Sequence, residues 1–367
     1  MSCPLCGGDD VVTTVTRARL PLMQNVVYAT REEALAAPAA PFELAVCGAC
    51  GFAFNGVFDA TLMRYDARYN NDVPSAAFED YCREIAGALV QRHALTSGVV
   101  VDVGAGKGRF LELFVEAHPA FSGLGIDPSC APRAGVVTLV ADVLRPAHVD
   151  RAAALVTCRH TLEHIADPLG FLRMIRGTLE RDVPVFVEVP DLTWTVEHGA
   201  FWDFCYEHCN YFTPDTLAFA LRAAGFTVDA VDHAFGGQYL WAHARPGAVD
   251  ETLPARASRP DLATYAAAET ARIDAARSRA HGAALWGMST KGVLFALLVG
   301  AELRGGVDIN RAKTGRFAPL TGLEIHAPDW LASLPDGPTV FVMNPNYAPE
   351  IAQRCAELGV AATLVEP

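Results

Sequence analysis

Basic residues are scarce in this sequence, and long apolar runs are missing. Lysine and arginine together number 29, against 42 aspartates and glutamates, which leaves a formal net charge of −13 at pH 7. Proteins that hold phosphate backbones need a concentrated basic surface, so we expect no nucleic-acid partner. The longest apolar run, near residues 293–303, is too short to span a bilayer, and no N-terminal stretch has the pattern of a secretory signal. We therefore expect a cytoplasmic protein without membrane contact.

The ten cysteines favour a metal site over disulfides. Four of them form two Cys-x-x-Cys pairs within residues 1–60, a region of short β segments (11–15, 26–28, 42–46 and 52–54) with too little core of its own. Four thiolates in this arrangement suit tetrahedral zinc, which would hold such a module together. The predicted ligands are Cys3, Cys6, Cys47 and Cys50. Coincidental pairs or a redox dithiol are the alternatives.

Helical and strand-like segments alternate beyond residue 60. A chain of 367 residues that is 51% hydrophobic can bury two or three cores. A helix is expected within 62–95, and strands follow at 99–103, 122–126, 136–140, 153–158 and 184–189. Helices are predicted at 107–117, 168–178 and 214–224, and a closing hairpin at 226–232 and 238–244. This order predicts an α/β fold with a doubly wound parallel sheet.

A Pro/Ala-rich stretch at 245–260 is typical of a linker. After it we expect a helix at 261–279, a strand-turn-helix unit at 283–292, and strands near 339–343 and 361–365. The sequence therefore predicts three units: a zinc module at 1–60, a central domain at 61–246 and a second, Rossmann-like α/β domain at 261–367.

The strand at 99–103 runs into three glycines, Gly104, Gly106 and Gly108, which open a helix. Glycines at alternate positions allow a sharp turn and a close approach of the backbone to a ligand, and the helix start offers unpaired N–H groups. A dinucleotide-binding loop has the spacing G-x-G-x-x-G. This tighter loop therefore favours S-adenosylmethionine (SAM) over NAD.

Three carboxylates lie where such a cofactor would contact the sheet. Asp127, about twenty residues past the loop, is expected to accept the ribose hydroxyls. Asp142 follows the third strand and is assigned to the adenine amino group, while Asp102 orients the glycine loop or reaches the methionine amino group. A surface position at the end of a strand is the alternative for Asp127 and for Asp142.

Two histidines and a glutamate follow the fourth strand, at the edge where ligands bind in open α/β sheets. His160, Glu163 and His164 form either a metal site without an evident third ligand or, as we expect, part of the pocket wall. We assign His160 to the cofactor side and His164 to catalysis.

A second group of titratable and aromatic residues lies at 203–214. Glu207 and His208 are adjacent there, and aromatic neighbours lower the local dielectric, which suits a general base near neutral pH. A core turn with a helix cap is the alternative. Tyr69, in the polar and aromatic segment 65–75, is expected to fold over the cofactor as a lid.

The C-terminal unit carries a candidate phosphate site. Ser289, Thr290 and Lys291 begin a helix, and helix N-terminal N–H groups with hydroxyl and lysine side chains bind phosphate well. Arg316 is expected nearby. A tight turn that only starts a helix is the alternative. The phosphate interpretation indicates a nucleotide-linked substrate.

With these motifs in view, the chain resembles the SAM-dependent C-methyltransferases that branch dTDP-keto-deoxysugars in antibiotic biosynthesis. The resemblance covers the whole length and implies a zinc-binding domain, a class I SAM methyltransferase core and a Rossmann-like domain that binds the nucleotide-sugar, in that order. The C-terminal matches are the runs 286–292 and 310–316 and the strand that ends at Asn344. Asn344 is therefore included among the substrate-binding residues.

The resemblance also implies residue roles. His208 would be the base, Glu207 its partner, His164 the second histidine and Tyr69 the lid tyrosine; the separation of 44 residues between His164 and His208 is like that of the sugar enzymes. The family pattern Tyr-x-Glu-His is altered here, because Cys205 takes the tyrosine's place and Tyr206 the x position. A sister branch with a non-sugar substrate would account for this change.

We therefore expect a SAM-dependent methyltransferase that methylates a carbon next to a carbonyl. His208 would remove the proton while Glu207 fixes its tautomer, and His164 or Tyr206 would donate to the developing oxyanion. Which histidine is the base stays open. The alternatives are O- or N-methylation of a small polar intermediate, a non-catalytic SAM-binding scaffold, and NAD-dependent oxidoreduction. A monomer or a homodimer is expected.

Overall fold

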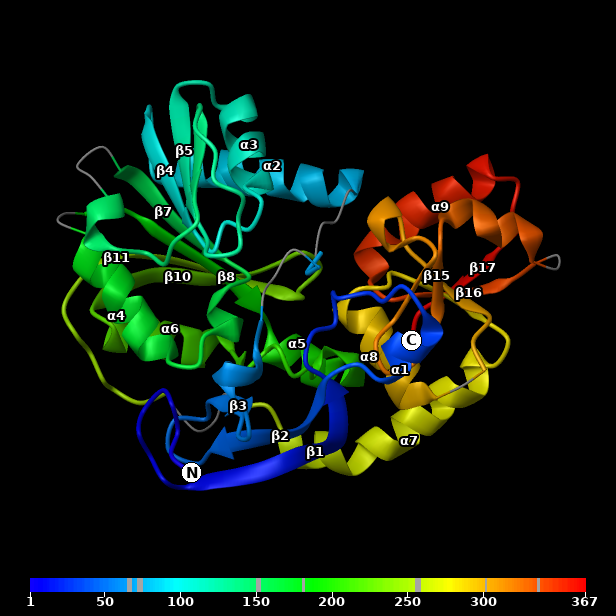
Figure 1. Cartoon of the computed structure of the whole chain (residues 1–367). Coiled ribbons are helices and arrows are strands. Elements are labelled where there is room, and N and C mark those ends of the chain that lie inside the picture. Colours follow the sequence, from blue (N-terminus) through cyan, green and yellow to red (C-terminus); the bar gives the residue numbers. More distant parts are fainter. Residues whose placement is uncertain are drawn as a thin grey trace.

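The computed structural model describes residues 1–64, 68–70, 75–149, 153–179, 182–254, 259–300, 302–334 and 337–367. These residues form three β-sheets, and Figure 1 shows the N-terminal sheet in blue below the other two. Within the described ranges, no helix has both the length and the apolar composition that a membrane span requires. The candidate active site lies between the central sheet and the C-terminal sheet.

The N-terminal sheet has the strand order β1-β2-β3-β9. Its first three strands, β1 (Val11–Pro21), β2 (Ala39–Cys47) and β3 (Ala53–Asn55), include three of the four predicted β segments. The fourth, 26–28, forms isolated bridges instead, from Val26 to Tyr69 and from Tyr28 to Phe317. The last strand, β9 (Asn210–Tyr211), comes from far along the chain and brings the segment after His208 against this sheet. A short helix, α1 (Arg31–Leu35), follows a capping box at Thr30.

The central sheet has seven strands in the order β10-β11-β8-β7-β4-β5-β6. Five are parallel, and β11 is antiparallel to both of its neighbours, β8 and β10. The bounds are β4 Gly98–Val103, β5 Phe121–Ile126, β6 Val137–Val140, β7 Ala153–Arg159, β8 Val185–Pro190, β10 Phe226–Ala234 and β11 Tyr239–Pro246. The predicted α/β fold with a doubly wound sheet is therefore confirmed.

Helices cover both faces of the central sheet. They are α2 (Ala76–Arg92), α3 (Arg109–Ala117), α4 (Pro168–Thr178) and α6 (Pro214–Ala223). Alternation along β4 explains why the sheet needs both layers: Val101 and Val103 join the core with α4 and α6, while Val100 joins the core with α2 and α3. A strand that is apolar on both faces is typical of a parallel sheet buried between helices.

The third sheet has the order β14-β15-β13-β12-β16-β17. Its strands are β12 (Ala284–Trp286), β13 (Gly305–Val307), β14 (Arg316–Phe317), β15 (Glu324–His326), β16 (Thr339–Val342) and β17 (Thr363–Val365). The helices α7 (Leu262–Ala280), α8 (Thr290–Val299) and α9 (Ala348–Glu357) accompany it. Since β12 lies between β13 and β16, the strand order reverses there, and such a point forms a ligand crevice in open α/β sheets.

The predicted linker is shorter than expected at its start. Strand β11 continues to Pro246, so the first two residues of 245–260 belong to the central sheet, and residues 255–258 lie outside the described residues. Arg259 then donates hydrogen bonds to the carbonyl oxygens of Gly48 and Ala49, at 2.8 and 2.6 Å. The chain is thereby fastened to the cysteine-rich region before α7 begins.

Candidate active site

One cavity of about 1540 Å³ is formed by the described residues of the central and C-terminal sheets. One side of it is the glycine loop between β4 and α3, and the opposite side is the turn between β12 and α8. The histidine-rich segment after β7 and the imidazole of His208 lie in the wall of the same cavity. Groups that the sequence separates by nearly 200 positions therefore share one space.

The glycine loop has the conformation that its sequence predicts. Gly104, Gly106 and Gly108 have φ angles of +79°, +52° and +80°, which side chains disfavour. A Cβ on Gly104 would lie 2.0 Å from the Thr161 hydroxyl oxygen, and one on Gly108 would lie 2.8 Å from Leu139. At Gly106 a Cβ would meet nothing within 4 Å, and this glycine and Gly104 line the cavity. The backbone is therefore open to a ligand at Gly106.

The three predicted cofactor carboxylates have different environments. Asp102 is buried, lines the cavity and accepts a 2.6 Å hydrogen bond from Thr157, and burial raises its pKa to about 6. Asp127 accepts from the Gly106 N–H at 2.9 Å and so supports the loop. Asp142 instead faces Arg145, whose Nε donates to it at 2.8 Å. Asp127 and Asp142 lie outside the cavity lining in this structure.

The segment after β7 forms a short 3-10 helix, η3 (Leu162–His164), which faces His208. The ligating atoms of Glu163, His164 and His208 all lie within 4.8 Å of one another, and the two imidazole centroids are 4.8 Å apart. The Nδ1 atom of His164 lies 3.0 Å from the main-chain oxygen of Glu207. Because a carbonyl only accepts, this nitrogen carries a proton, which leaves Nε2 of an uncharged His164 with its lone pair.

His208 is uncharged at neutral pH in this environment. Burial and the nearby positive charge of His164 lower its pKa to about 3, against the opposing effect of the Glu163 carboxylate. An uncharged imidazole has a lone pair that can take a proton, but a pKa of about 3 makes His208 a weaker base in the resting protein than the predicted base near neutral pH.

His160 lies apart from the two other histidines. Its backbone is left-handed, with φ of +48°, and its ring lies between Glu163 (3.6 Å) and Glu188 (3.3 Å). Burial alone would lower its pKa, but the two carboxylates outweigh burial and raise the pKa to about 9. His160 therefore lines the cavity as a cation.

The sequence-based role of Glu207 needs correction. Its buried carboxylate accepts from the Gln24 N–H at 2.6 Å rather than facing His208. Burial raises the pKa of Glu207, against opposing effects that include the charge of His164 and a hydrogen bond with Tyr69. The carboxylate near His208 is that of Glu163, whose ligating oxygen lies within 4.8 Å of the imidazole.

The expected oxyanion role of Tyr206 does not fit its position. Tyr206 is fully buried outside the cavity lining, and its hydroxyl accepts from the Asp59 N–H at 3.0 Å. Tyr69 does line the cavity and pairs with Val26, although much of the predicted lid, at 65–67 and 71–74, lies outside the described residues.

On the opposite wall, the structure brings together most of the predicted substrate residues. Ser289, Thr290, Lys291 and Asn344 line the cavity. The Nζ atom of Lys291 lies 3.2 Å from Asp203. Arg316 is exposed on β14 and is not among the residues that line the cavity.

Lys313 and Asn25 are among the cavity residues that sequence reasoning missed. Lys313 is buried and its Nζ donates to the Met288 main-chain oxygen at 3.0 Å, with Asp308 at 3.5 Å. Asn25, from the N-terminal region, lies between Lys313 and Thr290 at 3.4 Å from each. Lys313 lies in the run 310–316 noted above, whereas nothing in the sequence marks Asn25.

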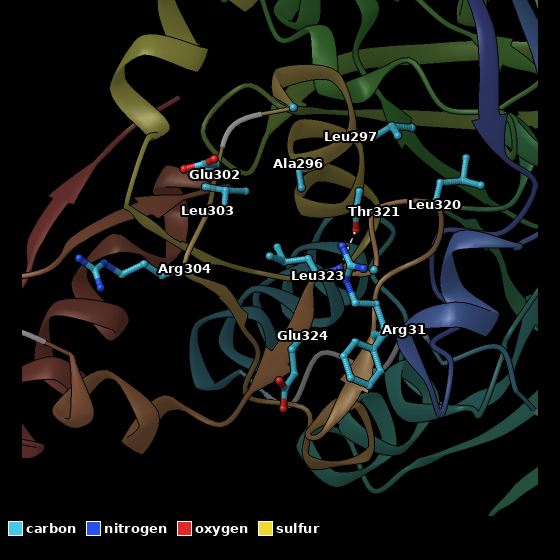
Figure 2. A pocket seen from close by; sticks show the side chains of 13 residues that line it. Arg31, Ala296, Leu297, Glu302, Leu303, Arg304, Leu320, Thr321, Leu323 and Glu324 are labelled. Atoms are coloured by element: carbon cyan, nitrogen blue, oxygen red, sulfur yellow. Dashed lines mark hydrogen bonds between the residues drawn. The ribbon is translucent and has the colours of Figure 1, made fainter.

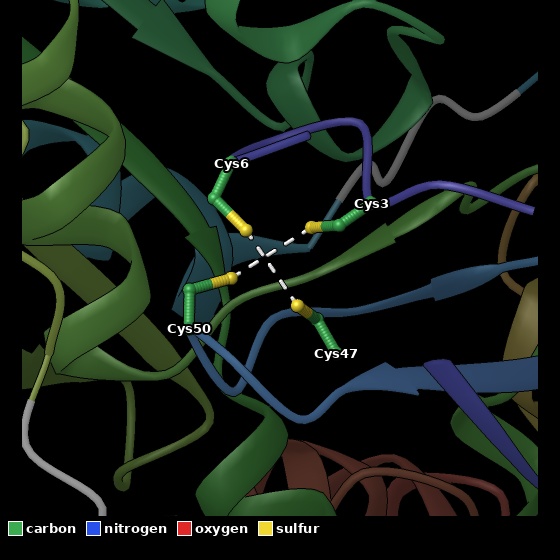
Figure 3. A group of neighbouring side chains, drawn as sticks. All are labelled: Cys3, Cys6, Cys47 and Cys50. Atoms are coloured by element: carbon green, nitrogen blue, oxygen red, sulfur yellow. Dashed lines mark hydrogen bonds between the residues drawn. The ribbon is translucent and has the colours of Figure 1, made fainter. Parts of the chain in front are cut away.

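The four predicted zinc ligands converge on one point, as Figure 3 shows. Sγ distances are 3.7 Å from Cys3 to Cys50 and 3.6 Å from Cys6 to Cys47, too long for disulfides. Tetrahedral zinc with bonds of about 2.3 Å separates its sulfur ligands by about 3.8 Å. The donor set and its spacing fit zinc.

A second hollow, of about 560 Å³, lies at the C-terminal end of α8 (Figure 2). Arg31, Leu303 and Glu324 are among the side chains that line it. None of the predicted site residues belongs to this hollow within the described part of the chain, so the chemistry is assigned to the larger cavity.

A known family model matches part of the chain. Residues 75–231 match the methyltransferase-domain family. This stretch runs from the start of α2 into β10 and contains the glycine loop and both catalytic histidine candidates. No curated protein matches the chain.

Solved structures resemble part of the chain. One is a 1,6-didemethyltoxoflavin-N1-methyltransferase from Burkholderia thailandensis with bound S-adenosylhomocysteine: it is 20% identical, covers 53% of this chain and 96% of its own, and has a TM-score of 0.37. A methyltransferase of calicheamicin biosynthesis is 19% identical over 45% of this chain and 54% of its own, with a TM-score of 0.36. A mitomycin 7-O-methyltransferase is 15% identical over 46% of this chain and 54% of its own, with a TM-score of 0.36.

Proposed function

We propose that the methyltransferase domain of this chain transfers a methyl group from SAM to a carbon next to a carbonyl in a small, nucleotide-linked molecule. The observation that carries the proposal is the single cavity that joins the glycine loop, the paired histidines and the start of α8. A keto-sugar nucleotide, or a related secondary metabolite, has a chemical group for each of these three places.

The glycine loop fits SAM. The open space at Gly106 admits a ligand, and the carboxylate of Asp102 at the cavity wall suits the methionine amino group. Asp127 would keep the loop in place through the Gly106 N–H. His160 would line the cofactor side of the cavity, and Asp142 is the proposed partner of the adenine amino group. When bound, SAM supplies an electrophilic methyl group.

His208 is the proposed base. Its uncharged ring removes the proton from the acceptor carbon, the electron pair moves to the carbonyl oxygen, and the resulting enolate carbon is the nucleophile. His164 is next to it and is the proposed partner for the oxygen, as a donor in its protonated form. Tyr69 lines the cavity and is the proposed lid tyrosine.

The start of α8 is the proposed site for a phosphate of the acceptor. Helix N-terminal N–H groups attract anions, and Ser289, Thr290 and Lys291 add hydroxyl and ammonium donors. Buried Lys313 adds a second positive charge close by, and Asn344 completes the wall. Nonphosphorylated ketones would leave this end of the cavity unfilled.

A structural zinc ion at Cys3, Cys6, Cys47 and Cys50 belongs to the same proposal. With four protein ligands it has no open position for catalysis. We also propose the division into units at 1–60, 61–246 and 261–367, with β9 tying the central unit to the first sheet.

The experiment separates carbon from oxygen or nitrogen methylation. The purified chain is incubated with S-adenosylhomocysteine and candidate keto-sugar nucleotides in heavy water, and then with SAM. Deuterium incorporation next to the carbonyl, followed by methylation of that carbon, is expected. Methylation of a hydroxyl or amine without exchange would support the O- or N-methylation alternative. SAM binding without methylation across these acceptors and nonphosphorylated ketones would support a scaffold.

A further inference from the structure

Neither the sequence motifs nor the family resemblance assigns Glu163 a role in the reaction. Its side chain is buried at the wall of the cavity, and its neighbours on three sides are imidazoles: His160, His164 and His208. One carboxylate oxygen faces His160 at 3.6 Å. The other, Oε2, is buried without a hydrogen-bond partner among the described residues. A buried carboxylate oxygen that accepts no hydrogen bond in the resting protein is costly.

The main chain around Glu163 is held in place from the β9 side. The Asn210 side chain donates to the carbonyl oxygens of Leu162 and Ile165, at 2.9 and 2.7 Å. The Cys209 thiol lies 3.5 Å from the Glu163 main-chain oxygen. These contacts join η3 to the segment that carries His208, so the carboxylate and the two rings keep a fixed relation to one another.

His160 is held from its other side. Its Nε2 faces Glu188, whose carboxylate also accepts from Arg159 at 2.7 Å and from the Trp241 indole N–H at 3.0 Å. The remaining nitrogen, Nδ1, therefore points to Glu163. A left-handed backbone is unusual for a residue other than glycine, and it turns this ring between the two carboxylates.

We propose that Glu163 is the residue that positions the His164–His208 pair for proton transfer, and that His160 in turn holds Glu163 in place. This inference rests on the proposed function. When the acceptor's proton moves to His208, the ring becomes an imidazolium and donates a hydrogen bond to Oε2 of Glu163. The carboxylate stays ionised throughout, and no further proton donor or acceptor is needed.

The charges around His208 make such a carboxylate necessary. His160, His164 and Lys291 are positive or can become so, and each disfavours a charged His208. The Glu163 carboxylate favours the charged ring. Although burial alone would raise it, the pKa of Glu163 is lowered by hydrogen bonding with His160 and by the positive charges of His164 and His160. Without Glu163, burial and these three groups would all oppose proton uptake by His208.

The test compares Glu163→Gln with Glu207→Gln, and with Glu197→Gln on the surface as a matched control. Glu163→Gln should lower kcat by about 10²-fold with little change in KM. Glu207→Gln should lower kcat much less, because its carboxylate accepts from the Gln24 N–H. Glu197→Gln should behave as the wild type. A loss of kcat with Glu207→Gln and not with Glu163→Gln would overturn the proposal.

A second measurement needs no acceptor. In full-length protein with S-adenosylhomocysteine and ¹⁵N-labelled histidine, ring nitrogen shifts report the tautomers of His164 and His208. Glu163→Gln should change them, and so should His160→Asn, which removes the cation but tolerates the left-handed backbone. Unchanged shifts in both variants would contradict the positioning role even if methyl transfer is found. Changed shifts without methylation of any acceptor would refute only the proposed function.

Discussion

His164 and Glu207 are joined through the main chain: Nδ1 of the imidazole lies 3.0 Å from the Glu207 carbonyl oxygen. This contact fixes the tautomer of His164. The sequence analysis instead predicted that the Glu207 side chain would fix the tautomer of His208. The backbone of the Glu207–His208 segment thus orients one histidine while it carries the other.

Replacing His208 should separate binding from chemistry. His208→Asn is expected to reduce methyl transfer by about 10²- to 10⁴-fold, because no base remains at the acceptor carbon. The affinity for S-adenosylhomocysteine, measured by calorimetry, should stay near the wild-type value, since the glycine loop lies apart from this ring. Undiminished turnover would refute the assignment of the base.

Two glycines of the loop should respond differently to replacement by alanine. Gly104→Ala should lower the melting temperature and abolish cofactor binding, because its Cβ would collide with the Thr161 hydroxyl at 2.0 Å. Gly106→Ala meets open space, so strain of about 1–2 kcal/mol is expected with the fold retained and cofactor affinity reduced. Thermal unfolding and ligand titration measure both. Equal destabilisation by the two changes would contradict this account.

Asp102 should make stability depend on pH. Burial raises its pKa to about 6 from about 3.9 in the unfolded chain, so its contribution is most favourable below pH 4 and is lost as pH rises through 6. Asp102→Asn should therefore stabilise the protein at pH 8, by up to about 3 kcal/mol, and much less near pH 4. Chemical unfolding at both pH values tests this. A variant less stable at pH 8 would show that the charged form is favoured.

Metal analysis should find one zinc per chain. Cys47→Ser should lose this zinc and lower the melting temperature, because the cysteine cluster holds the N-terminal sheet together. Cys130→Ser, outside the cluster, is the control and should keep the metal. A second equivalent of metal that disappears with His208→Asn would contradict the base assignment, because a coordinated imidazole cannot take the proton.

The acceptor site should depend on Lys291 and not on Arg316. Lys291→Ala is expected to raise the KM for a phosphorylated acceptor by about tenfold or more, since a charge-assisted contact is lost. Arg316→Ala, exposed and outside the cavity, should leave that KM unchanged. Steady-state kinetics with both variants decide the matter. A larger effect at Arg316 would place the phosphate elsewhere.

Much of the fold was predictable from local patterns. The strand 99–103 was placed within one residue of β4, and the hairpin after Gly225 became β10 and β11. These predictions succeed because period, β-branched residues and glycine act within a few positions. The strand β9 was not predictable, because two residues can pair only once the distant N-terminal sheet exists.

The sequence alone determined the glycine loop and the four-cysteine set, because both are fixed by spacing along the chain. Only the tertiary structure decided which acid serves the histidines. Glu207 is adjacent to His208 in sequence, but its carboxylate accepts from the Gln24 N–H, which the N-terminal region brings to it from 183 positions away. Glu163 reaches the same imidazole from 45 positions away, because β7 and β9 deliver both to one edge of the cavity.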